Sequence, residues 1–117
     1  MADPFARAHA KLVKAAEGLP EVVQSTWFNT PSLKVRSKSL CRVKDADTVV
    51  IMCPLEEKEV LMEAAPEFYF ETAHYHGWPA VLVRIHDVPL AELKLRLKRA
   101  WFMQAPKTLA KAFAASR

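Results

Sequence analysis

The stretch AHYHGWPAVLVRI, residues 73–85, carries the side chains in this sequence that are best suited to chemistry. Its first half groups two histidines, a tyrosine and a tryptophan about one glycine: His74, Tyr75, His76, Gly77 and Trp78. Side chains of these types serve as metal ligands, as general acids and bases, and as stacking platforms for nucleic-acid bases. The surrounding sequence must distinguish these uses, because each residue type alone is compatible with several of them.

The spacing of the two histidines gives little support to a metal centre or to catalysis. Histidines two residues apart could ligate a metal together, but no third ligand stands near them in the sequence. Acid–base catalysis needs a base, a partner that orients it and a substrate pocket. Glu71 and Asp87 could orient a histidine, yet nothing in the sequence fixes their geometry. We therefore expect a protein that is not an enzyme and that uses no metal and no cofactor.

The aromatic side chains of this stretch are open to more than one interpretation. Tyr75 and Trp78 flank a turn that Gly77 and Pro79 force on the chain. Beside cationic side chains, such rings can stack on nucleic-acid bases. They can equally pin the turn to an underlying sheet, which is a purely structural role. A small-ligand pocket around the two histidines and Tyr75 is a further alternative.

Length and composition limit the class of protein. The 117 residues fit a single domain, residues 1–117, and 51% of them are hydrophobic, which suffices for a core without disulfides or metal. Seventeen Lys and Arg residues against thirteen Asp and Glu residues give a formal net charge of +4. That excess is compatible with an acidic partner and does not by itself identify one.

The two cysteines and the N-terminal segment indicate the compartment. Cys41 and Cys53 lie in apolar runs without metal-ligand spacing, so we expect buried, reduced thiols. The N-terminal segment lacks the apolar stretch of a signal peptide, and no apolar run is long enough to span a bilayer. These features predict a cytoplasmic protein without membrane contact.

Hydrophobic periodicity predicts the elements that must position these residues. Helical spacing covers four segments that each begin at a proline: residues 4–17, 54–65, 89–104 and 106–116. Period-two stretches predict strands at residues 21–29, 32–38, 39–45, 48–53, 68–72 and 80–86. The links among the first four strands are so short that these strands must form an antiparallel meander. The predicted fold class is α+β, a two-layer domain with helices on one face of an antiparallel sheet, in the order α-β-β-β-β-α-β-β-α-α.

Strand alternation assigns the cationic side chains of the sheet to one surface. If the apolar residues of each strand face the helices, the intervening cations lie together on the opposite, open face. The cations concerned are Lys34, Arg36, Arg42, Lys44 and Arg84. Cations contributed by several strands would suit a phosphate backbone, although an exposed sheet face must be polar in any case.

The sequence thus favours a non-enzymatic binding domain that contacts DNA through this basic face. The residues assigned to nucleic-acid binding are Lys34, Arg36, Arg42, Arg84, His76 and Trp78, with Lys38, Lys44, His74, Tyr75 and Lys107 as secondary candidates. Contacts of this kind would position the protein on a phosphate backbone without reading the base sequence.

The alternative function is a module that binds an acidic protein or a second copy of itself as a homodimer. Residues 89–104 carry a second apolar stripe, Leu95 and Phe102, away from the side that should face the core. Either the following helix, through Leu109 and Phe113, or a dimer partner would cover this stripe. The aromatic turn at residues 74–79 would extend such an interface.

Several motifs together resemble the small bacterial MmcQ/YjbR family. The matching segments are LPEVVQSTWFNTPSLKVRSKSLCRV, HYHGWPAVLVRI, VPLAELKLRLKRAW and APK, in this order and over roughly residues 8–112. The positions that match recurrent motifs of the family are Pro31, Lys34, Arg36, His74, Tyr75, Gly77, Pro79, Arg84, Trp101, Pro106 and Lys107. Asn29 and Thr30 depart from the pattern, which often has a glycine ahead of the proline.

This resemblance implies an antiparallel sheet flanked by helices, related to secretion-chaperone-like folds. The arrangement has been likened to the double wing of a phage transcription factor, and the DNA-binding label of the family comes from that comparison. No catalytic residues are established for the family, so the resemblance implies none in this chain. A likeness of fold does not by itself settle function.

Overall fold

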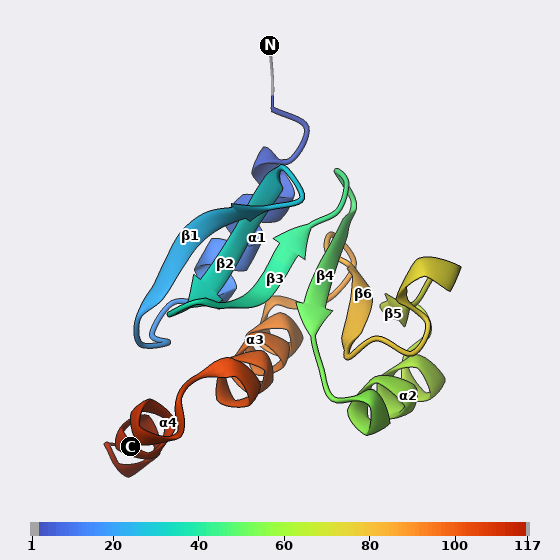
Figure 1. Ribbon diagram of the computed structural model, residues 1–117. Coiled ribbons are helices and arrows are strands. Elements are labelled where there is room, and N and C mark those ends of the chain that lie inside the picture. Colours follow the sequence, from blue (N-terminus) through green and yellow to red (C-terminus); the bar gives the residue numbers. More distant parts are fainter. Residues whose placement is uncertain (1–2, 117) are drawn as a thin grey trace.

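The computed structural model describes residues 3–116 and contains the expected elements in the expected order (Figure 1). The helices are α1 (Ala6–Ala15), α2 (Leu55–Ala64), α3 (Leu90–Gln104) and α4 (Lys107–Ala115). The strands are β1 (Val22–Trp27), β2 (Thr30–Val35), β3 (Lys38–Val43), β4 (Thr48–Met52), β5 (Tyr69–Phe70) and β6 (Ala80–Arg84), with a 3₁₀ turn, η1 (Ala73–Tyr75), between the last two. The predicted α+β class and element order are confirmed.

The strands described here form one antiparallel sheet in the order β1-β2-β3-β4-β6-β5. β1 to β4 are the predicted meander. After β4 the chain passes through α2 to the edge strand β5 and then returns as β6, which pairs with both β4 and β5. The η1 segment connects β5 to β6, so its position depends on the edge of the sheet that these two strands form.

The main hydrophobic core lies between one face of the sheet and the helices α1 and α3 (Figure 1). Leu97 and Trp101 of α3 are fully buried there, and the Trp101 indole donates a hydrogen bond to the Pro20 oxygen at 2.9 Å. A bulge in the β2–β3 pairing lets two consecutive residues, Leu40 and Cys41, enter this core. Burying one large apolar side chain such as leucine stabilises a fold by about 1.5–3 kcal/mol. The core between the sheet and the helices α1 and α3 contains most of these side chains, so it supplies most of the stability.

The other face of the sheet is covered over β4 and β6. The residues around η1 fold back onto it and bury a small second core, which consists of Val50, Tyr75, Ala80 and Leu82. Val50 and Leu82 alternate along their strands with residues of the main core, so they mark the opposite face. The face that strand alternation predicts to be open is therefore covered over β4 and β6, and Ser32 of β2 and Arg42 of β3 are buried on it as well.

The helix α4 packs beside the end of α3. The centroid of the Phe113 ring lies 5.0 Å from that of Trp101 and 5.8 Å from that of Phe102. The prediction that this helix covers the second apolar stripe of α3 holds only in part for Phe102, which contacts Phe113 but remains 36% exposed. It is wrong for Leu95, which remains 46% exposed.

Both cysteines are buried free thiols, as predicted. Burial raises the pKa of Cys41 to about 12 and that of Cys53 to about 11, so both stay protonated and weakly nucleophilic at neutral pH. Among residues 3–116, no helix has the length and the apolar character that crossing a bilayer requires.

Candidate functional site

The β1–β2 hairpin presents an exposed phenylalanine in an unfavourable backbone conformation. Phe28 and Asn29 form its two-residue loop with φ angles of 53° and 62°, the left-handed pair that a type I′ turn requires. Asparagine adopts this conformation readily, whereas for a bulky residue it costs about 1–2 kcal/mol. The Phe28 side chain is nevertheless 62% exposed and stacks on Trp27, with 5.4 Å between ring centroids. Backbone strain of this kind is typically found at functional sites.

Arg42 of β3 lies beneath that hairpin loop. It is only 9% exposed, and its guanidinium lies 5.2 Å from the centroid of the Phe28 ring. Nη2 donates to Tyr75 Oη at 2.7 Å and Nη1 to Thr30 Oγ1 at 3.3 Å. No carboxylate in the described part of the chain forms an ion pair with this guanidinium. Strand alternation gives the correct face of the sheet, but the prediction of an exposed cation is wrong, because Phe28 and Tyr75 cover it.

The aromatic turn, residues 74–79, rests on the sheet through its tyrosine. Its first residues form a 3₁₀ turn and not a strand, so the alternation expected for His74 and His76 does not apply. Tyr75 is buried, whereas the His74 ring stacks on Trp78 with 5.8 Å between centroids. Trp78 itself remains 42% exposed. In this turn the Tyr75 ring is thus buried against the sheet, whereas the His74 and Trp78 rings are exposed.

A buried lysine of α2 fixes the same turn from its other side. Lys58 is 1% exposed, and its Nζ donates to the backbone oxygens of Tyr75 at 2.7 Å and Trp78 at 3.1 Å. Nζ also lies 2.8 Å from Glu71 Oε1, and Glu71 Oε2 forms a 2.6 Å hydrogen bond with His76 Nδ1. These contacts with His76 and Lys58 hold the pKa of Glu71 below its ordinary value. All three N–H donors of the ammonium group therefore have acceptors.

Sequence reasoning did not single out Lys58, although one signal was present. Its neighbours in the acidic run EEKE, residues 56–59, suggest a solvated helix face. Helical spacing, however, places Lys58 on the same side as Leu61, Met62 and Ala65, which pack against the main core. A cation on the apolar side of a short helix is expected to reach for backbone acceptors.

Only part of the predicted cationic set shares the second face of the sheet. Lys34 is half-buried there, and Lys44, one residue beyond the end of β3, is half-buried too; neither has an ion-pair partner among residues 3–116. The Arg84 guanidinium lies over the Phe70 ring, 4.2 Å from its centroid. It also lines a cavity of about 310 Å³ together with Asp47, which lowers the local positive potential.

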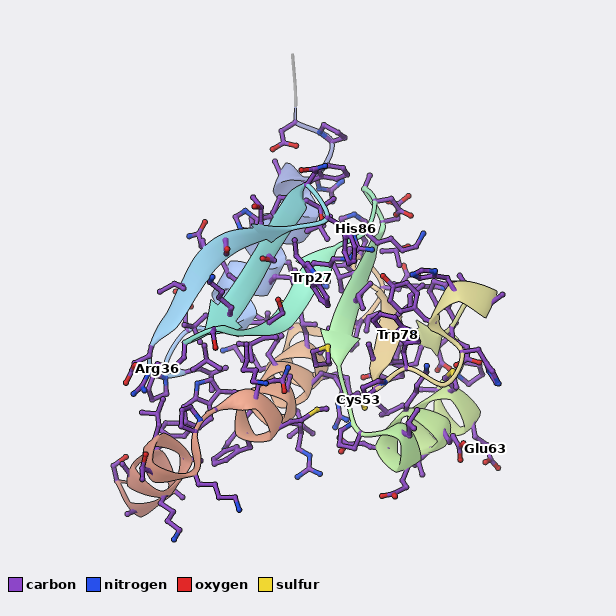
Figure 2. The ribbon with its side chains drawn as sticks, in the orientation of Figure 1. Trp27, Arg36, Cys53, Glu63, Trp78 and His86 are labelled. Carbon is purple, nitrogen blue, oxygen red and sulfur yellow. The ribbon has the colours of Figure 1, made fainter. Side chains whose placement is uncertain are left out.

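The other predicted cations lie elsewhere. Arg36 follows the last residue of β2 with a φ of 55°, so strand alternation ends before it, and its Nη2 bonds to Glu21 Oε2 at 3.0 Å. Figure 2 shows Arg36 at the outer edge of the sheet, away from Trp27, which lies over the middle strands. Lys38 begins β3, and Lys107 begins α4. The prediction that the cations converge on one basic surface is therefore wrong.

What the structure gathers on the second face is a set of rings about a buried cation. We call it the aromatic face, and it consists of Trp27, Phe28, Arg42, His74, Tyr75 and Trp78. Figure 2 shows its tryptophans over the middle strands and beside β6, respectively. Its exposed rings offer flat apolar surfaces in fixed orientations. In residues 3–116 no group of three His, Cys, Asp or Glu side chains is placed to hold a metal ion.

Comparison with known proteins gives relatives without an assigned activity. A family model described as YjbR matches residues 17–103. Uncharacterized proteins of Mycobacterium bovis and Mycobacterium tuberculosis are 44% identical over 59 residues, which is 50% of this chain and 46% of theirs. The match thus spans about half the length of these curated relatives. The crystal structure of a Deinococcus radiodurans protein with a DUF419 domain aligns with a TM-score of 0.69 at 20% identity, over 99% of this chain and 91% of that one. Identity this low shows a shared fold alone.

Proposed function

The chain belongs to the YjbR family, and we propose that it is a non-enzymatic protein that binds DNA on the aromatic face. The observation that carries the proposal is the display of Phe28, His74 and Trp78 as exposed rings. The first of these lies against buried Arg42 and the other two against buried Tyr75. A single exposed ring on a protein surface needs no functional explanation. Several exposed rings on one surface, however, are typical of a platform on which nucleic-acid bases stack. The strained backbone of Phe28 supports a role for that ring beyond stability.

Preorganisation distinguishes this platform from aromatic residues that are merely exposed. Arg42 holds Phe28 by a cation–π contact and Tyr75 by a hydrogen bond, while Lys58 fixes the backbone on both sides of His76. A ligand that stacks here need not order these segments when it binds, so less of the stacking energy is lost. Each stacked base contributes about 1–3 kcal/mol, which is roughly a 5- to 150-fold change in Kd.

Phosphate contacts would come from three cations, Lys34 and Arg84 on this face and Lys44 just beyond the end of β3. In this proposal Arg42 positions the rings and does not touch the ligand, and Arg36 has no part because Glu21 neutralises it. Three phosphate contacts predict a log–log salt dependence of Kd with a slope of only about 2–3. Most of the affinity should therefore come from stacking, and the affinity should fall only modestly as the ionic strength rises.

A titration of fluorescently labelled oligonucleotides, followed by anisotropy, tests this proposal. Phe28→Ala and Trp78→Ala should each weaken binding by roughly 5- to 150-fold. Phe102→Ala is the matched control, because Phe102 is a partly exposed ring on α3, away from the aromatic face. Absence of binding at low salt, or equal losses in Phe102→Ala and Phe28→Ala, would refute the proposal.

The same assay over a series of salt concentrations tests the phosphate contacts. Lys34→Ala should lower the salt slope by about one, since it removes one contact. Lys107→Ala should leave the slope unchanged, because Lys107 lies on α4. A slope that responds equally to both substitutions would place the phosphate backbone outside the aromatic face.

A further inference from the structure

A second apolar surface lies on the helices, separate from the aromatic face. The large exposed apolar side chains of α2 and α3 are Leu55, Val60, Leu95, Phe102 and Met103. Val60 is 64% exposed and Leu95 46%. Scattered apolar residues are ordinary on a protein surface, but a group on two adjoining helices is typical of an interaction site.

Ion pairs join the exposed sides of α2 and α3 that carry these residues. Glu57 of α2 accepts hydrogen bonds from Arg96 at 2.7 Å and from Arg99 at 2.9 Å. The contact with Arg99, and to a lesser extent that with Arg96, holds the pKa of Glu57 below its ordinary value, so the pairs persist at neutral pH. Val60 and Arg99 then line one shallow cavity of about 410 Å³ between the two helices.

Charges of opposite sign flank this apolar centre. On α2, Glu56, Glu59 and Glu63 are exposed and have no ion-pair partner within residues 3–116. On α4, Lys107 and Lys111 are exposed and likewise without an acidic partner in that range. Figure 1 shows α4, α3 and α2 in succession along one side of the molecule, with α3 in the middle, and Figure 2 places Glu63 at the α2 end.

We propose that a second copy of this chain docks on this surface to form a two-fold symmetric dimer. In such a dimer each patch meets itself after a rotation of 180°, so the patch must be self-complementary. A surface that is acidic on α2 and basic on α4, with Leu95 and the Glu57-paired Arg99 of α3 between them, satisfies this condition, because the rotation brings α2 of one copy opposite α4 of the other and α3 against α3. A partner of uniform charge would instead meet repulsion at one end. This inference does not depend on nucleic-acid binding.

Sedimentation equilibrium of the full chain over micromolar to millimolar concentrations tests the apolar centre. The unaltered protein should self-associate, and Val60→Gln combined with Leu95→Gln should raise the dissociation constant about tenfold or more. Val23→Gln is the matched control, since Val23 is a 49% exposed valine on β1. A monomer throughout the range, or equal weakening by Val23→Gln, would overturn the proposal.

A charge exchange tests the symmetry of the dimer. The pair Lys107→Glu and Lys111→Glu makes both ends of the surface acidic, whereas Glu59→Lys and Glu63→Lys makes both ends basic. Each double variant alone should dimerise more weakly than the unaltered chain, and an equimolar mixture of the two should recover a dimer that contains one of each. Failure of the mixture to recover it would rule out the two-fold arrangement.

Discussion

Replacing Lys58 with methionine should destabilise the protein through the aromatic turn. Methionine keeps the unbranched side chain but removes the ammonium group that bonds to the backbone oxygens of Tyr75 and Trp78 and to Glu71. The side chain is buried, so water does not replace the lost donors without moving the turn. The substitution therefore tests whether Lys58 holds the turn on the sheet.

The expected loss in the free energy of unfolding follows from the hydrogen bonds that each acceptor keeps in the variant. The Trp78 oxygen loses its donor, and an orphaned carbonyl costs about 1–3 kcal/mol. The Tyr75 oxygen keeps the Trp78 amide at 3.0 Å, so its loss is smaller. Glu71 is 24% exposed and retains His76, which limits its share to under about 1 kcal/mol. Methionine also removes the desolvation cost of a buried ammonium group, which offsets part of this, so the net loss should be about 1–3 kcal/mol.

Urea denaturation followed by circular dichroism measures this loss in the free energy of unfolding. Lys94→Met is the control, since Lys94 is exposed on α3 and its substitution should change that free energy by no more than about 0.5 kcal/mol. Iodide quenching of tryptophan fluorescence should rise in Lys58→Met as Trp78 is released. A loss below about 1 kcal/mol with unchanged quenching would show that Lys58 does not hold the turn.

Three further predictions concern the same region. Tyr75→Phe should lower the free energy of unfolding by about 1–3 kcal/mol, because buried Arg42 loses its 2.7 Å acceptor; a neutral result in urea denaturation would contradict the role given to Arg42. Phe28→Asn should keep the free energy of unfolding within about 1 kcal/mol, since relief of left-handed strain offsets the lost ring contacts, while oligonucleotide binding falls; a large loss of stability would place that ring in the core. The pKa of Glu71 is depressed in the folded state, so its stabilising effect is present above its ordinary pKa of 4.5 and is lost as the pH falls through the lower folded value. The difference in stability between the unaltered protein and Glu71→Gln should therefore shrink below pH 4.5, and a difference that grows there would contradict the ion pair.

The positions of the helices and strands could be predicted because local signals fix them. Pro54, Pro89 and Pro106 each stand immediately before the first residue of a helix, where the missing N–H is no loss. The short links between β1 and β4 leave no connection other than hairpins. The same locality explains why Arg42 was assigned to the correct face of its strand.

Burial could not be predicted in this way, because distant segments determine it. Arg42 is covered by a residue fourteen positions before it and by another thirty-three after it, Phe28 and Tyr75. Neither contact leaves a periodic signal in the sequence of β3. Arg36 illustrates a different limit, since alternation has no meaning one residue beyond the end of a strand, where a left-handed turn redirects the side chain toward Glu21.

The aromatic turn needs two buried cations from different elements, and this arrangement argues for a function beyond stability. An apolar cover for Val50 and Leu82 could be built with aliphatic residues alone, without burying a guanidinium and an ammonium. Arg42 and Lys58 instead act on the directions of side chains and carbonyls, since hydrogen bonds are directional and apolar contacts are not. The Tyr75 side chain and the backbone at Tyr75 and Trp78 are thus held more tightly than burial requires. Such fixed geometry favours binding on a surface whose aromatic rings stack on planar groups of another molecule.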